Sequence, residues 1–152
     1  MHILETLIGC AGNWHGTNTL QDPTTGKPEE TASTAVITPL LGGRFVRFDY
    51  TWLYQGTPQE GSILFGYDKQ SGTVAAHWID SWHMGNKVMV CEGQEQDSNA
   101  LSVVGSYAAP PGPDWGWRIN LTMGDGTLGM SMNNIWPDGR EEPAGEAHET
   151  RE

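Results

Sequence analysis

Basic residues are scarce in this chain of 152 residues, which has eight Lys and Arg against 19 Asp and Glu and a formal net charge of −11. A protein of this charge repels phosphate backbones and anionic membrane surfaces, so we expect neither nucleic acid nor a membrane as a partner. Cysteine is equally scarce. Cys10 and Cys91 are too few for a disulfide framework, which favours free thiols and a cytoplasmic location.

Long hydrophobic runs and the common catalytic motifs are also missing. No stretch approaches the ~20 apolar residues of a membrane helix, and residues 1–6 lack the basic start of a signal peptide. The chain has no phosphate-binding glycine loop, nucleophile elbow or Cys-x-x-Cys pair. His77, Asp80 and His83 contain metal-ligand groups, but along an extended strand the two histidines lie ~20 Å apart. We therefore expect no metal site, unless the chain bends sharply after Asp80.

Glycine and tryptophan are abundant instead, with 20 and seven residues, which is typical of many short strands joined by tight turns. The clearest strand is residues 44–54. Its alternate residues Val46, Phe48, Tyr50 and Trp52 fall on one face, because side chains alternate along a strand. This pattern predicts a sheet with one packed face and one mixed face.

The same reasoning predicts about nine or ten strands and one short N-terminal helix over residues 2–9, in a single domain of residues 1–152. The expected strands are residues 14–20, 30–38, 44–54, 60–67, 73–81, 87–94, 100–107, 115–123, 127–136 and, less clearly, part of 141–152. No helices separate them, so an antiparallel meander is expected. Closure into an up-and-down β-barrel over about residues 11–150 would remove the exposed edges, and a two-sheet sandwich is the competing all-β fold.

Four segments together resemble the signature of a bacterial family known as domain of unknown function 1579. They are Gly12-Asn13-Trp14-His15-Gly16, Leu41-Gly42-Gly43-Arg44-Phe45, Glu60-Gly61 followed by Gly66-Tyr67-Asp68, and Trp78-Ile79-Asp80-Ser81. The resemblance extends from about residue 7 to residue 136. It implies a calycin-type barrel, the architecture of lipocalins and fatty-acid-binding proteins, and it implies no activity.

The segment Gly12-x-Trp14-x-Gly16 also resembles the opening of nitrobindin-like haem barrels. Those proteins have their proximal histidine in the last strand, and the one histidine near the end of this chain is His148. No motif surrounds His148, so no cofactor is expected and haem remains a minority alternative.

Candidate ligand-binding residues are aromatic side chains that could stack on a flat apolar ligand and a few polar groups, although the sequence leaves open which face of each strand lines the interior. They are Trp14, Arg44, Tyr50, Trp52, His77, Trp78, Asp80, Arg118 and Asn134. Arg118 lies between Trp117 and Ile119, so it points into the barrel if the tryptophan face points outward. A solvent-facing arginine is the alternative. For Asp80, a hydrogen bond to a turn is favoured over a role as acid or base.

The favoured function is a barrel that binds a small apolar or amphipathic ligand in its interior, with Arg118 or Arg44 available for a carboxylate. A structural or interaction protein with a filled barrel, forming a homodimer, comes second. An enzyme that uses Asp80 or a histidine in the cavity comes third. No catalytic residue is assigned.

Overall fold

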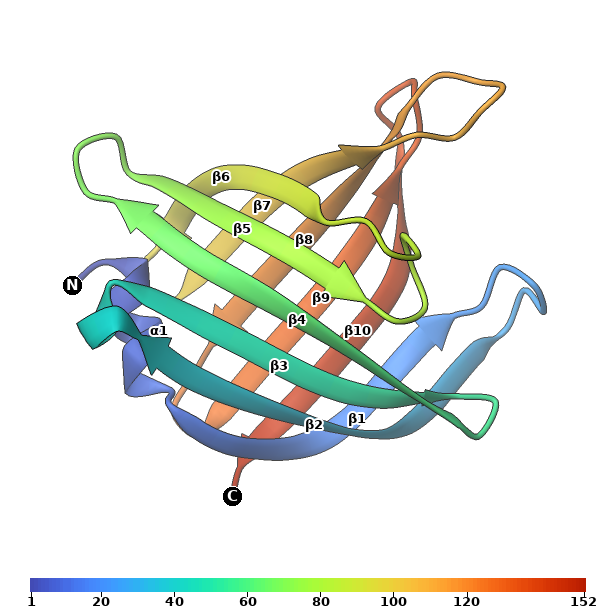
Figure 1. The fold of residues 1–152 in the computed structure, drawn as a ribbon. Coiled ribbons are helices and arrows are strands. Elements are labelled where there is room, and N and C mark those ends of the chain that lie inside the picture. The colour runs from blue at the N-terminus through green and yellow to red at the C-terminus, as the bar shows by residue number, and fades with distance from the viewer.

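The ten strands form one closed antiparallel barrel in the computed structural model, which describes residues 1–152 (Figure 1). Each strand pairs with the next one along the chain, and β1 pairs with β10 to close the ring. The strands are β1 (Gly12–Gln21), β2 (Pro28–Leu40), β3 (Phe45–Tyr54), β4 (Thr57–Asp68), β5 (Thr73–Asp80), β6 (Met89–Asp97), β7 (Ala100–Tyr107), β8 (Trp115–Met123), β9 (Thr127–Ile135) and β10 (Glu141–Arg151). The all-β barrel is therefore confirmed, and the sandwich alternative is wrong.

A short helix, α1 (Ile3–Gly9), closes one end of the barrel beside the 3-10 turn η1 (Leu41–Gly43) (Figure 1). The helix begins at Ile3 rather than at residue 2, because His2 is its N-cap and accepts a hydrogen bond from the backbone N–H of Glu5. Ile3, Leu4 and Leu7 are buried against the sheet. None of the helices has the length and apolar character needed to cross a membrane.

Alternate residues of each strand fill the barrel, as the pattern of β3 predicts. Val46, Phe48, Tyr50 and Trp52 are all buried, with at most 7% of their surface exposed. Large buried side chains from β1, β4, β5, β7 and β8 join them in one hydrophobic core. The two free cysteines are buried in this core as well.

The last residues complete the barrel, which the sequence predicted less clearly than the other strands. β10 pairs with β9 on one side and with β1 on the other. Arg151 then ties the chain end to the start, because its guanidinium donates to the backbone oxygens of Gly9 and Ala11, each at 3.1 Å. Its charged carbon also lies 4.6 Å from the ring centroid of Trp14.

Candidate functional site

The end of the barrel opposite α1 is open, and we call it the mouth. It contains a cavity of about 270 Å³. The apolar and aromatic lining includes Tyr50, Trp52, Trp78, Trp82, Trp117, Met130 and Met132. The polar side chains among its lining residues are those of Asn18, Gln21, Asp80, His83, Asn134, Glu142 and Glu146. A concave, mainly apolar site with a few polar groups is the usual form of a small-molecule pocket.

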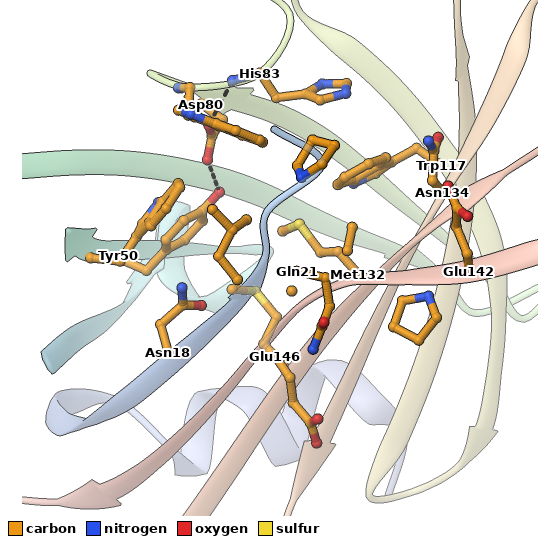
Figure 2. A pocket seen from close by; sticks show the side chains of 18 of the residues that line it. Asn18, Gln21, Tyr50, Asp80, His83, Trp117, Met132, Asn134, Glu142 and Glu146 are labelled. Carbon is orange, nitrogen blue, oxygen red and sulfur yellow. Dashed lines mark hydrogen bonds between the residues drawn. The ribbon is translucent and has the colours of Figure 1, made fainter. Parts of the chain in front are cut away.

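A chain of hydrogen bonds runs along the wall that contains Tyr50 (Figure 2). Trp78 donates from its indole Nε1 to the Tyr50 hydroxyl at 2.8 Å, and that hydroxyl donates to Asp80 Oδ2 at 2.5 Å. Gly61 lies between Tyr50 and Asp80 in the sheet, paired with both. A Cβ on Gly61 would lie 2.2 Å from the Tyr50 hydroxyl, so only glycine leaves room for the ring.

Asp80 also holds the turn that follows β5. Its Oδ1 accepts from the backbone N–H of Trp82 at 2.7 Å and of His83 at 3.0 Å. The carboxylate therefore accepts three hydrogen bonds in all. Burial raises the pKa of Tyr50 well above its ordinary value, and the charge of Asp80 adds to the effect. Tyr50 thus remains a neutral hydrogen-bond donor to Asp80.

The turn held by Asp80 brings His83 into an aromatic cluster. The His83 ring centroid lies 4.5 Å from that of Trp117, 5.3 Å from that of Trp78 and 5.0 Å from that of Tyr107. Burial lowers the pKa of His83, and the charge of Asp80 opposes this only in part. Two buried atoms of the cluster, His83 Nδ1 and Trp117 Nε1, have no hydrogen-bond partner.

A buried acid lies further into the barrel, toward α1. Glu149 on β10 is 4% exposed, and its Oε1 accepts a hydrogen bond from the hydroxyl of Ser33 on β2. Gly16 on β1 lies between these two residues in the sheet. Burial raises the pKa of Glu149, and its Oε2 has no partner. The interior therefore combines an apolar core with one poorly solvated carboxyl group.

Comparison with known proteins places the chain in a family. The model of a family described as a protein of unknown function, DUF1579, matches residues 2–151. The chain belongs to the DUF1579 family. It is also similar to the crystal structure of Rv2717c from M. tuberculosis, with a TM-score of 0.71 and 15% sequence identity over 99% of this chain and 97% of that chain. At this identity the likeness shows the fold alone. No curated protein matches the chain.

The structure brings five of the nine candidate residues to the mouth of this DUF1579 barrel. They are Tyr50, Trp52, Trp78, Asp80 and Asn134. Figure 2 shows Tyr50 and Asp80 on one side of the cavity and Asn134 and Glu142 on the other. Asn134 accepts a hydrogen bond from the Tyr107 hydroxyl through its Oδ1 at 2.5 Å.

The other four candidates lie elsewhere. Trp14 is buried near α1 and donates to the backbone oxygen of Cys10, so it belongs to the closed end. Arg44 is exposed beside η1, also at the closed end. His77 is exposed on the outer face of β5, because the alternation that turns Trp78 and Asp80 inward turns His77 outward.

Of the two alternatives for Arg118, the structure has the outward-facing one. Trp117 is 6% exposed and lines the cavity, so the next residue, Arg118, faces outward. Its guanidinium forms two hydrogen bonds with Glu141, at 2.9 and 3.1 Å, and one with Ser102 at 2.9 Å. The hydrogen bonds from Arg118 lower the pKa of Glu141. Neither Arg44 nor Arg118 is available to a ligand in the mouth.

Fourteen of the 19 lining residues were not among the candidates, although the alternation contains signals for some of them. Met130 and Met132 lie on the same strand face as the candidate Asn134. Trp117 lies on the opposite face of β8 from its neighbour Arg118. His83 carries no such signal, because a turn rather than a strand places it in the cavity. Its position depends on the two backbone hydrogen bonds to Asp80.

Proposed function

We propose that this protein binds a small, planar, apolar or amphipathic molecule in the mouth of its barrel. The observation that carries the proposal is the aromatic cavity at the mouth, in a barrel whose other half is filled by its own side chains. Its volume of about 270 Å³ lies just below the range of ~300–1,000 Å³ typical of pockets for drug-sized molecules. The ligand is therefore expected to be small, with one or two rings.

The geometry of the tryptophans supports a planar ligand. The rings of Trp78 and Trp117 are nearly parallel, with an interplanar angle of 9° and centroids 5.3 Å apart. The rings of Trp52 and Trp82 meet nearly at a right angle, with centroids 5.8 Å apart. Parallel and perpendicular faces together can contact both the face and the edge of a flat molecule.

Two buried polar atoms in the aromatic cluster add support. His83 Nδ1 and Trp117 Nε1 have no protein partner, and an unsatisfied buried polar group costs about 1–3 kcal/mol. Unsatisfied buried groups are rare in native proteins, and each one calls for an explanation such as a bound water or ion. A ligand that supplies a polar atom here would recover part of this cost. The resemblance to calycin-type barrels, which include ligand-enclosing lipocalins, points in the same direction.

Binding is favoured over catalysis because the carboxylate of Asp80 is already occupied by structural hydrogen bonds. Its carboxylate accepts from Tyr50 and from the backbone of Trp82 and His83, so proton transfer would disrupt bonds that hold the turn. A homodimer formed through outer strand faces stays a prediction. Ile79 and Val90, which are 49% and 57% exposed, are the apolar side chains it would use.

The first experiment is native mass spectrometry of the protein purified from its source organism, beside the denatured mass and an absorbance scan for haem. We expect a noncovalent adduct that is lost on denaturation. An apo mass at a defined oligomer number would instead favour the interaction protein.

A matched pair of variants then locates the binding site. Asn18 on β1 lines the cavity, and a phenylalanine there would fill it. Asn13 lies on the same strand with its side chain exposed. We expect Asn18→Phe to lose the adduct and Asn13→Phe to retain it. Retention of the adduct by both folded variants would contradict binding in the mouth.

A further inference from the structure

The charges that line the mouth are of one sign. Asp80 on β5 and Glu142 on β10 both line the cavity, and no Lys or Arg side chain does. Glu142 is paired with Asn134 in the sheet, on the strand face that turns toward the mouth. Glu146 also lines the cavity, but its carboxylate is 2.8 Å from His148 Nε2 on the outer face, so we do not count it.

No Lys or Arg of the cavity lining cancels this charge. Arg118 is held outside by Glu141, and the guanidinium of Arg140 lies 4.0 Å from the ring centroid of Trp136. Lys87 lines a separate groove on the outer surface. His83 lines the cavity, but burial lowers its pKa and keeps its ring neutral. A cleft with charges of one sign and apolar walls concentrates counter-ions inside it.

The aromatic rings favour cations for a second, independent reason. The face of an indole ring carries negative electrostatic potential, and tryptophan is the strongest of the natural cation–π partners. Trp52, Trp78, Trp82 and Trp117 all line this one cavity. Arg140 over Trp136 and Arg151 over Trp14 show that the same contact occurs elsewhere in the protein.

From these two observations we infer that the mouth selects planar organic cations, such as protonated aromatic amines, over anions with the same ring. This inference rests on the proposed function. Asp80 and Glu142 supply the negative potential from opposite walls, and the tryptophans supply the ring faces (Figure 2). A carboxylate ligand would have no basic partner in the cavity and would lose its hydration without compensation.

The test uses three ligands that share one ring and differ in charge: benzylammonium, benzyl alcohol and benzoate. NMR titration would follow the indole N–H signals of the tryptophans, with Trp78 and Trp117 reporting on the mouth. Trp14, buried at the closed end, is the internal control. We expect benzylammonium to bind about ten-fold or more tightly than benzoate, with benzyl alcohol between them. The preference should weaken at high salt.

A charge-neutralising variant distinguishes the effect of local charges in the mouth on ligand affinity from the effect of the protein's net charge. Glu142→Gln should weaken benzylammonium binding about two- to five-fold, as expected for a partly exposed charge. Glu92→Gln on the exposed face of β6 removes the same charge away from the mouth and should have no such effect.

The outcomes are distinct. Benzoate binding as tightly as benzylammonium would overturn the charge selectivity and leave the proposed function standing. Equal weakening of benzylammonium binding by both Glu variants would also overturn it, because net charge would then explain the preference. If none of the three ligands moves the Trp78 and Trp117 signals, and native mass spectrometry shows no adduct, both the inference and the proposed function fail.

Discussion

Tyr50 donates its hydroxyl hydrogen to Asp80 at 2.5 Å, across a strand whose residue at that point is a glycine. The hydrogen bond connects β3 to β5 across Gly61, which lies on the intervening strand β4. Asp80 in turn holds the backbone of Trp82 and His83, so the shape of the mouth depends on this one crossing. The family resemblance included Gly61 and Asp80 in separate segments, and the sheet register brings them together.

Gly61→Ala should disturb this crossing. Its Cβ would lie 2.2 Å from the Tyr50 hydroxyl and displace the ring, and overpacking of this kind costs about 1–3 kcal/mol. Chemical denaturation would measure the loss of stability. Gly66→Ala is the matched control on the outer face of β4, where the new Cβ meets only the Phe45 ring edge at 3.1 Å. Equal stability of Gly61→Ala and the wild type would show that the ring moves at no cost.

Tyr50→Phe should be destabilising although it keeps the ring. Removal of the hydroxyl leaves Trp78 Nε1 without an acceptor and takes one of three donors from Asp80. An unsatisfied buried donor costs about 1–3 kcal/mol, so the midpoint of denaturation should fall by a corresponding amount. The turn residues 81–88 should also lose protection against amide hydrogen exchange, because Asp80 is less well positioned. Unchanged protection there would mean that Asp80 holds the turn without Tyr50.

The two thiols should be inert in the folded protein. Burial raises the pKa of Cys91 to about 11 and also raises that of Cys10, where the charge of Arg151 opposes the effect. Since the thiolate is the reactive form, iodoacetamide at about pH 8 should label neither residue until the protein unfolds. Mass spectrometry after timed labelling measures this. Faster labelling of Cys91 than of Cys10 in the folded protein would contradict the burial of Cys91.

The barrel could be predicted from the chain because its signals are local. Alternation along residues 44–54 correctly identified the buried face of β3, and the expected strands at residues 115–123 and 127–136 correspond to β8 and β9. Closure depends instead on the register of β10 against β1, over more than a hundred residues of sequence separation. Local patterns hold no information about such a pairing, so the last strand was the least certain.

The site was less predictable, because alternation gives two faces without saying which one is inside. For residues 115–123 the choice of face was left open, and Arg118 was expected in the interior only if Trp117 pointed outward. Trp117 points inward, and Arg118 pairs with Glu141, a residue from another strand. Likewise, the place of His83 depends on a bend after Asp80, and a strand period cannot predict a bend. Both cases depend on contacts between segments far apart in the chain or outside its periodic elements.

Glu149 makes the stability of this barrel depend on pH. Burial raises its folded-state pKa above the ordinary value of 4.5, whereas in the unfolded chain it titrates near that value. Below the unfolded pKa both states hold the proton, so the carboxyl group costs nothing. As pH rises toward and through the folded-state pKa, the unfolded state releases its proton more readily, and stability is lost.

Glu149→Gln should remove this loss, because the amide resembles the protonated acid and its oxygen can still accept from Ser33. We expect the variant to be more stable than the wild type at neutral pH and similar to it near pH ~4. Glu146→Gln, on the exposed face of the same strand, should follow the wild-type profile. Urea denaturation of the three proteins across this pH range provides the measurement. A wild-type stability that rises with pH relative to Glu149→Gln would mean that the buried carboxylate is stabilised in the folded state, with its unpartnered Oε2 hydrated or bonded after all.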